Sequence, residues 1–379
     1  MQKAYKLHGV HRHYDWGGTE FIPTLMKVEN PNHQPFAEYW MGAHPSAPAQ
    51  IETVNGIVSI NELGSIPYLF KVLDVAKMLS IQVHPTKENA VIGFELEEKT
   101  WIAIDAPNRN YKDKNHKPEV MVALSEFWLL HGFLAPDLMG ARLQEFDYFH
   151  SLQTYFKEDD YEGLYRYFMQ LSSHEADLIL KPLMQDAVTS VQRGEVDKSH
   201  PHWWANKYYN SVVPEKHIDK GIFSIYILNI VKANKYQAVF QGAGLLHAYL
   251  EGQNIELMAN SDNVLRGGLT PKHIDIVELL KHIQFVPTYP NVMSGETING
   301  VETIYPCPVA DFGLSKIALK AGEAYTIHTK SLEMLLVMEG VLIVEGQSYH
   351  RGEVALVAAA QSLEMQSQQG AVVFKSFVP

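Results

Sequence analysis

Apolar residues along most of the chain form short runs of strand length that are separated by glycine turns. Residues 68–75 are one such run, and residues 222–231 are rich in β-branched and aromatic side chains, which is typical of a buried strand. Residues 245–250 and 255–258 are two more runs, and Glu251-Gly252 between them predicts a turn. Short strands joined by glycine turns indicate an antiparallel sandwich or barrel rather than a parallel sheet with crossover helices.

The segment from about Pro136 to Lys207 departs from this pattern, because its apolar spacing is helical. Ser172 followed by Glu175 makes a capping box, in which each side chain satisfies a free backbone N–H at a helix start. Gly194 can end that helix in the left-handed conformation. One face of the helix would carry Ala176, Ile179, Leu180, Leu183, Met184, Ala187, Val188 and Val191. We therefore predict a helical insertion within an otherwise β protein.

The C-terminal part of the chain again has the pattern of β-hairpins. Turns are predicted at Glu339-Gly340 and Glu345-Gly346, and prolines with glycine in residues 287–295 indicate a linker before this unit. The chain is thus predicted to have a first β part of a catalytic domain at 1–135, a helical insertion at 136–215, a second β part at 216–286 and a C-terminal β unit at 287–379.

Charge and composition narrow the classes of partner. The 379 residues include 31 lysines and arginines against 43 aspartates and glutamates, and the formal net charge is −12. This charge, with no basic block, argues against nucleic acid or an anionic membrane as partner. An anionic small substrate would need a local cationic pocket. No apolar run is long enough to span a bilayer, and the N-terminus has no apolar segment typical of a signal peptide.

Cysteine usage gives a further limit. The single cysteine, Cys307, excludes an intramolecular disulfide and a cysteine-rich zinc site. It also fits a reducing compartment. We expect a cytoplasmic protein without membrane contact, and a monomer as the first expectation, with an oligomer as the alternative.

Gln82 and His84 are the first candidates for chemistry. In a strand their side chains point to the same face, opposite Ile81 and Val83. An amide and an imidazole on one face suit a wall that lines a polar cavity. Taken alone, a core histidine beside an incidental glutamine is the slightly better interpretation.

Three further segments carry polar side chains that are weak candidates alone but indicate a site when they are taken together. Pro118 favours extended backbone before it, which places Lys117 and Glu119 on one face and His116 on the other. His247 lies on a predicted strand after a glycine turn. Residues 260–272 combine acids, amides, an arginine and a Gly-Gly pair, which favours a loop that binds something.

Together, Gln82, His84, Glu119 and His247 offer two nitrogens and two oxygens. That is a suitable set of ligands for Zn²⁺ that leaves a position open for water or substrate. Mn²⁺, Fe²⁺ or Co²⁺ could also bind such ligands. One carboxylate among neutral ligands leaves net positive charge, which would favour an oxyanion.

The chain resembles the type I mannose-6-phosphate isomerases (phosphomannose isomerases), which are zinc enzymes of the cupin superfamily. The motifs that carry the resemblance occur in order at residues 15–18, 37–45, 68–73, 80–85, 115–119, 246–250 and 260–272. The resemblance implies a mainly β fold of cupin-type jelly-roll barrels, one catalytic and one C-terminal, with an inserted α-helical domain. It also implies reversible isomerisation of mannose 6-phosphate to fructose 6-phosphate, a small sugar phosphate, through a cis-enediol.

The family's site residues carry over onto matching positions of this chain. The resemblance implies one zinc ion per chain, held by Gln82, His84, Glu119 and His247, and a catalytic arginine at Arg266. Arg266 and zinc would stabilise the oxyanion. Other pocket residues carried over are Lys71, Ser80, His116, Lys117, Tyr249, Glu256 and Asp262. Lys117, Glu256 and Asp262 are equal candidates for the general base, and Lys71 with Ser80 is the candidate phosphate site.

Two other functions also fit part of the pattern. Two histidines and a carboxylate describe the facial triad of non-haem Fe(II) oxygenases, although Gln82 would then need explaining. A non-catalytic cupin would bind a sugar phosphate without turnover. Metal analysis and an assay with mannose 6-phosphate separate these functions.

Overall fold

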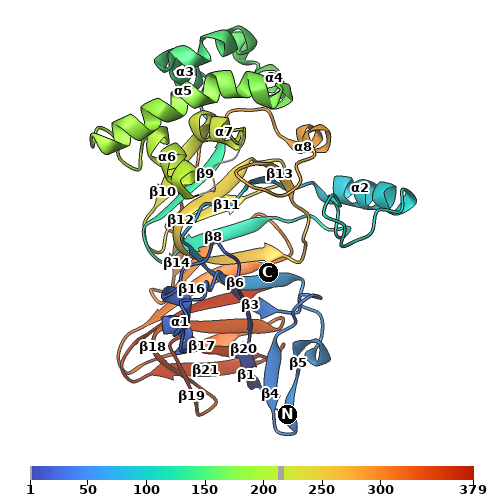
Figure 1. The fold of residues 1–379 in the computed structure, drawn as a ribbon. Helices are drawn as coiled ribbons and strands as arrows, with labels where there is room; N and C mark the ends of the chain where they lie inside the picture. The colour runs from blue at the N-terminus through green and yellow to red at the C-terminus, as the bar shows by residue number, and fades with distance from the viewer. Residues whose placement is uncertain (1, 212–216) are drawn as a thin grey trace.

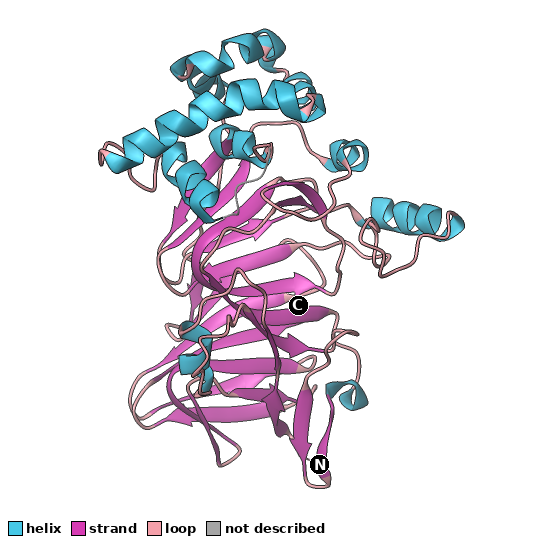
Figure 2. Cartoon of the chain, viewed as in Figure 1, coloured by secondary structure: helices cyan, strands magenta, loops and turns pink. Residues whose placement is uncertain are grey.

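The computed structural model describes residues 2–211 and 217–379, and it is built mainly from antiparallel strands (Figure 1, Figure 2). Two sheets follow one another along the long axis of the molecule, and most of the helices gather at one end of it. The mainly β, antiparallel fold predicted from the sequence is confirmed. No helix in the described part of the chain combines the length and the apolar character that crossing a bilayer requires.

The upper sheet of Figure 1 contains every strand that faces the candidate site. Its main order is β10-β9-β12-β6-β3-β2, and β7, β8, β11 and β13 attach to this path. The strands are β2 (Val10–Arg12), β3 (Glu38–Gly42), β6 (Tyr68–Val75), β7 (Ile81–Val83), β8 (Glu119–Ala123), β9 (Phe127–Phe133), β10 (Leu228–Ala233), β11 (Ala238–Gln241), β12 (His247–Ala259) and β13 (Leu265–Gly268). The run at residues 68–75 is therefore one strand, as predicted.

Strand β12 runs through the middle of this sheet, and its first and second halves have different neighbours. Its first half pairs with β7 and β9, and its second half pairs with β6 and β8. The turn predicted at Glu251-Gly252 is wrong, because the chain continues as one strand through a bulge. Gly252 has φ of +125°, and a Cβ there would lie 2.6 Å from the Glu126 carbonyl oxygen. The glycine serves a close approach of two strands rather than a turn.

The lower sheet joins both ends of the chain. Its main order is β14-β15-β16-β22-β18-β20-β1-β4-β5, with β17, β19 and β21 attached. The strands are β1 (Ala4–His8), β4 (Gln50–Thr53), β5 (Gly56–Ser59), β14 (Glu296–Ile298), β15 (Glu302–Tyr305), β16 (Gly313–Leu319), β17 (Glu323–His328), β18 (Glu333–Val344), β19 (Gln347–His350), β20 (Val354–Val357), β21 (Ser362–Ser367) and β22 (Ala371–Phe377). Because β1 pairs with β20, the N-terminal strands complete the sheet of the C-terminal unit.

The two turns predicted in this unit have different outcomes. Glu345-Gly346 connects β18 to β19 with positive φ at both residues, so this turn is confirmed. The turn at Glu339-Gly340 is wrong, because β18 continues through it with a bulge. A bulge glycine and a turn glycine leave the same trace in a sequence, since both need a positive φ.

Helices between β9 and β10 form the end of the molecule at the top of Figure 1. They are α3 (Pro136–Glu145), η2 (Asp147–Tyr155), η3 (Lys157–Asp159), α4 (Tyr161–Gln170), α5 (Ser173–Gln192) and α6 (Pro201–Ser211). The capping box of Ser172 and Glu175 is present, and Gly194, with φ of 68°, follows the end of α5. The predicted boundary at 215/216 lies outside the described residues.

The strand predicted over residues 222–231 is wrong in its first half. Residues Gly221–Ile227 form α7, and β10 begins only at Leu228. Every residue of α7 is buried, Ser224 included, and a run that is buried on all sides has no periodicity that distinguishes helix from strand. The remaining helices are α1 (Phe21–Met26), η1 (Ile60–Leu63), α2 (Lys87–Lys99) and α8 (Ile276–His282).

Apolar side chains pack on the outer face of the upper sheet, and the side chains between them face a cavity on its other side. Tyr68, Phe70 and Val72 of β6 belong to the core shared with the lower sheet, together with residues such as Leu336 and Phe374. The residues between them, including Lys71, face the other way, into a cavity. A second apolar core packs the helices onto strands β7, β9 and β12. The polar side chains of the cavity therefore stand on a rigid scaffold.

Candidate active site

A cavity of about 610 Å³ opens on the inner face of the upper sheet. Strands β3, β6, β12 and β13 supply its walls, and the loop after β13 supplies part of its rim. It is lined by all the predicted site residues except His84 and His116, namely Lys71, Ser80, Gln82, Lys117, Glu119, Tyr249, Glu256, Asp262 and Arg266 together with His247. Chain segments from residue 71 to residue 266 thus meet in one space.

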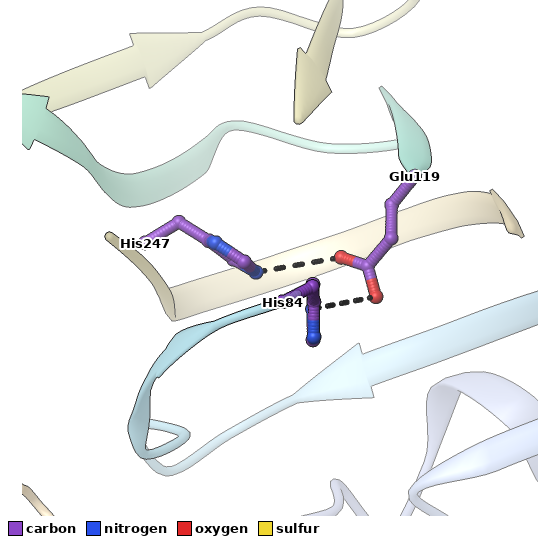
Figure 3. Close-up of side chains that lie close together, drawn as sticks. All are labelled: His84, Glu119 and His247. Atoms are coloured by element: carbon purple, nitrogen blue, oxygen red, sulfur yellow. Dashed lines mark ion pairs between the residues drawn. The ribbon is translucent and has the colours of Figure 1, made fainter. Parts of the chain in front are cut away.

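Three of the four predicted metal ligands converge at the end of this cavity (Figure 3). His84 Nε2 lies 3.4 Å from one carboxylate oxygen of Glu119, and His247 Nε2 lies 3.5 Å from the other. The three ligand atoms lie within 4.8 Å of one another, and all three residues are buried. Two imidazoles and a carboxylate at these separations suit one divalent cation.

The hydrogen bonds of the two histidines fix which nitrogen faces the centre. His84 Nδ1 bonds to the Asn263 carbonyl oxygen at 2.8 Å, and His247 Nδ1 bonds to the Leu245 carbonyl oxygen at 2.9 Å. Because a carbonyl oxygen only accepts, each Nδ1 carries the hydrogen and each Nε2 presents a lone pair. His84 Nε2 is buried and has no hydrogen-bond partner among the described residues. A bare lone pair at this depth fits a metal ion.

Burial and the nearby Lys117 determine the protonation states of His84 and Glu119. Burial, with the nearby Lys117 charge, lowers the pKa of His84 to about 4, so this imidazole is neutral near pH 7. Burial opposes ionisation of Glu119, but the Lys117 charge, together with the contacts that His84 and His247 make to the carboxylate, holds the pKa of this carboxyl well below the usual range. Lys117 Nζ donates to Glu119 Oε1 at 2.5 Å. A neutral imidazole at His84 and an ionised carboxylate at Glu119 are the protonation states that a metal ion requires.

Gln82 is placed beside these ligands by strand pairing. In register it lies opposite His247 on β12 and opposite Arg266 on β13. Residues directly opposite one another in an antiparallel sheet share a face. His247, Gln82 and Arg266 therefore form a row across three strands, and all three line the cavity.

The floor of the cavity holds a second buried group of charges. Glu256 accepts from Lys71 Nζ on one oxygen and from the Tyr249 hydroxyl on the other, each at 2.8 Å. Burial opposes the charge on Lys71, but Glu256 and Glu38 raise the pKa of this ammonium. Burial and Glu256 raise the pKa of the Tyr249 hydroxyl well above its usual value. Lys71 and Tyr249 thus supply the hydrogen bonds that the buried Glu256 carboxylate needs.

Two other cations that line the cavity, Arg266 and Lys272, make no ion pair of this kind within the described residues. Among residues 2–211 and 217–379, no carboxylate lies within ion-pair distance of the Arg266 guanidinium or the Lys272 ammonium. Burial lowers the pKa of Arg266, and burial together with the Arg266 charge lowers the pKa of Lys272. Two cations in the same cavity without an ion-pair partner in the described part of the chain form a site for an anion. This is the local cationic pocket that an anionic substrate needs.

Asp262 lies at the edge of the same cavity. Its side chain is half-exposed, and its Oδ2 lies 3.3 Å from His44 Nε2. Burial raises the pKa of this carboxyl, but His44, Lys117 and Lys71 together lower it, so the group is ionised near pH 7.

His116 is the one predicted substrate contact that lies elsewhere. Its Nε2 lies 3.0 Å from Asp311 Oδ2, in the segment between β15 and β16, and it does not line the cavity. Pro118 keeps the segment extended, so His116 points away from the face that carries Lys117 and Glu119. A contact between His116 and the substrate therefore stays a prediction.

Sequence reasoning assigned no role to several residues that line the cavity. Lys272 is the clearest case, although it ends a loop that was singled out. Glu38 and Trp40 stand on β3, and Tyr208 reaches the cavity from α6 in the helical region. The motifs at 15–18 and 37–45 contained Trp16, Glu38 and Trp40, but nothing in a single sequence shows which residues face a common space.

The comparisons with known proteins agree with this geometry. Residues 4–135 match the family model of the type I phosphomannose isomerase catalytic domain. Mannose-6-phosphate isomerase of Escherichia coli is 37% identical over 93% of this chain and 94% of that protein. The rat enzyme of the same name is 29% identical over 95% of both chains. A crystal structure of mannose 6-phosphate isomerase from Salmonella typhimurium, bound to fructose 6-phosphate and zinc, covers both chains fully with a TM-score of 0.87 and 32% identity.

Proposed function

The chain belongs to the mannose-6-phosphate isomerase family, and we propose here which of its residues carry out the interconversion of mannose 6-phosphate and fructose 6-phosphate. The enzyme uses zinc. Neither a non-haem iron oxygenase nor a non-catalytic sugar-binding protein is supported, since the relatives are isomerases and the structural neighbours contain zinc. One observation carries the assignment of roles: the His84, Glu119 and His247 cluster opens onto a cavity that is also lined by Arg266 and Lys272, which make no ion pair among the described residues.

We assign Gln82, His84, Glu119 and His247 as the zinc ligands. The backbone carbonyls of Asn263 and Leu245 hold the two imidazoles with Nε2 inward. Gln82 is the register neighbour of His247 and lines the same cavity, so its amide oxygen can complete the set. When bound, zinc supplies positive charge that polarises the oxygen atoms of the substrate beside the reacting carbons.

Arg266 and Lys272 divide the anionic parts of the substrate between them. Arg266 is the register neighbour of Gln82, so its guanidinium lies next to the ligand cluster and stabilises the developing enediolate oxygen. Lys272 lies in the loop that follows β13, the strand of Arg266, and binds the phosphate. The Ser80 hydroxyl can donate to the same group. Lys71, the earlier candidate for the phosphate, is already paired with buried Glu256.

The proton transfer between C1 and C2 needs a base with a free lone pair. Both oxygens of Glu256 accept short hydrogen bonds, and Lys117 Nζ already donates to Glu119. Asp262 is ionised and contacts only His44 through its carboxylate among the described residues. We assign Asp262 as the group that takes the proton from the substrate carbon, and Lys117 as a donor to the neighbouring oxygen.

A coupled assay with mannose 6-phosphate tests this assignment. Activity should disappear when a chelator removes the metal and should return with added Zn²⁺. In deuterated solvent, the C2 hydrogen should exchange with solvent in the intact enzyme and be retained in Asp262→Asn. Full exchange in Asp262→Asn would move the base to another residue.

A further inference from the structure

His44 follows strand β3 and is one of the most buried polar residues near the cavity, with 4% of its surface exposed. Its ring packs edge-to-face on Trp40, with the ring centroids 4.9 Å apart. Trp40 in turn contacts Lys71, whose Nζ lies 5.4 Å from the ring centroid. Because the indole and the buried backbone enclose the imidazole, its orientation is fixed before any substrate binds.

The partners of Nδ1 settle which nitrogen of His44 carries the hydrogen. The backbone N–H of Ser46 donates to His44 Nδ1 at 3.3 Å, and the Ser46 hydroxyl lies 2.9 Å from the same atom. A nitrogen that accepts from a backbone N–H carries a lone pair, so the hydrogen of the neutral ring is on Nε2. This N–H faces Asp262 Oδ2 at 3.3 Å.

Hydrogen bonds from the residues on both sides of Asp262, and from its own backbone N–H, hold the loop that carries it, but they do not involve its carboxylate. The backbone N–H of Asp262 donates to Asp113 Oδ2 at 2.8 Å, and the Ser261 hydroxyl donates to Asp113 Oδ1 at 2.9 Å. Asn263 is fully buried and donates to the Asn115 carbonyl oxygen at 2.8 Å. Only the direction of the half-exposed Asp262 side chain is left unset by these bonds.

Two cavities compete for that side chain. Asp262 lines the active-site cavity, and it also lines a neighbouring cavity of about 620 Å³ together with His44, Lys112 and Asp113. Within the described part of the chain, His44 is the one side chain within ion-pair or hydrogen-bond distance of the Asp262 carboxylate. Without His44, the carboxylate could turn into the second cavity.

We propose that His44 is a positioning residue that holds the Asp262 carboxylate in its reactive orientation in the active-site cavity. This inference rests on the role of Asp262 in the proposed function. His44 acts through Asp262, as an oriented imidazole that donates one hydrogen bond from Nε2, and does not itself exchange a proton with the substrate. The lowered pKa of Asp262 agrees with a donor at this position.

Substitutions that keep or remove the N–H at the position of Nε2 test this inference. His44→Ala should lower kcat by about 10- to 100-fold, because a misplaced catalytic group costs rate rather than binding, while KM changes little. His44→Gln should restore most of kcat, since the amide of glutamine reaches the position of Nε2. His44→Asn should not, since the shorter amide reaches only the position of Nδ1.

A double-variant cycle separates a positioning role from a general one. If His44 acts through Asp262, His44→Ala should have no further effect on kcat in the Asp262→Asn background. Independent losses that multiply in the double variant would overturn the inference, and so would equal activity of the alanine, glutamine and asparagine variants. Full activity of Asp262→Asn alone would instead remove the proposed role of Asp262.

Zinc content and thermal stability should be measured on each variant, so that a folding defect is recognised. His202→Ala is a matched control, because His202 is 5% exposed, packs among aromatic rings and bonds to the Tyr226 hydroxyl, outside the cavity. It should lose stability but keep kcat. A His44→Ala variant with normal zinc content and the kcat of the control would also overturn the inference.

Discussion

Lys71 Nζ lies 2.8 Å from Glu256 Oε1 at the floor of the cavity, and less than a tenth of either side chain is exposed. Removing one member of a buried pair leaves the other charge without compensation, whereas removing both leaves none. Lys71→Met should therefore lower the free energy of unfolding by about 3–5 kcal/mol. The double variant Lys71→Met/Glu256→Gln should lose less than Lys71→Met alone. Urea unfolding of the parent, the single variant and the double variant measures both values, and a larger loss in the double variant would contradict the pairing.

Arg266 and Lys272 should give different kinetic signatures. Lys272→Ala should raise KM for mannose 6-phosphate by about 10- to 100-fold with kcat nearly unchanged, because a charged hydrogen bond to the phosphate is present in both ground and transition states. Arg266→Ala should lower kcat by a similar factor, and should slow exchange of the C2 hydrogen in deuterated solvent. Lys114→Ala is the control, since Lys114 is an exposed partner of Glu95. An unchanged rate of isomerisation in Arg266→Ala would remove it from the catalytic role.

The stability of the metal-free protein should depend on pH through its buried histidines. Burial lowers the pKa of His84, His131 and His202 to about 4 in the folded chain, against 6.5 for the free side chain. The unfolded chain therefore binds more protons between pH 6.5 and pH 4, so stability is complete above pH 6.5 and declines as the pH falls towards 4. Thermal unfolding across this range measures the decline. His202→Gln should make it shallower, and a parent protein whose stability is flat across this range would contradict these pKa values.

Asn263 should link loop structure to zinc affinity. Its side chain accepts from the backbone N–H of Lys112 at 2.7 Å and donates to the Asn115 carbonyl oxygen, while its own carbonyl oxygen holds His84 Nδ1. Asn263→Ala keeps that carbonyl but releases the loop that aims it. We expect zinc affinity to fall by about 10- to 100-fold, as for other residues that orient a ligand. Competition with a chromogenic chelator measures this, and unchanged affinity would mean that the backbone alone orients His84.

The sequence predicted the regular parts of the fold well where local patterns decide the structure. Residues 68–75 are a mainly apolar run of strand length, and the Ser172 and Glu175 pair marks a helix start by bonds within one turn. Sequence patterns were misleading where one pattern is compatible with several local structures. Glycine marked a turn at Gly346 but a bulge at Gly252, and the wholly buried residues of α7 carried no period.

In the candidate site, too, the sequence predicted what local spacing decides and missed what tertiary packing decides. Side-chain spacing placed Lys117 and Glu119 on one face, and His84, Glu119 and His247 do converge. The positions of His44 and Lys272 could not be predicted in this way. A histidine after a strand and a lysine after a loop acquire significance only through the distant segments that they face, and those are set by tertiary packing.

The bulge in β12 also determines what changes this strand can accept. His247 and Tyr249 line the cavity from odd-numbered positions, and Glu256 and Met258 line it from even-numbered positions. In an unbroken strand these two sets would point to opposite sides, and the extra residue near Gly252 reverses the alternation between them. Deleting a single amino acid there would turn either the metal ligand or the floor carboxylate into the hydrophobic interior. Length at this point is therefore under stricter constraint than the identity of most neighbouring side chains.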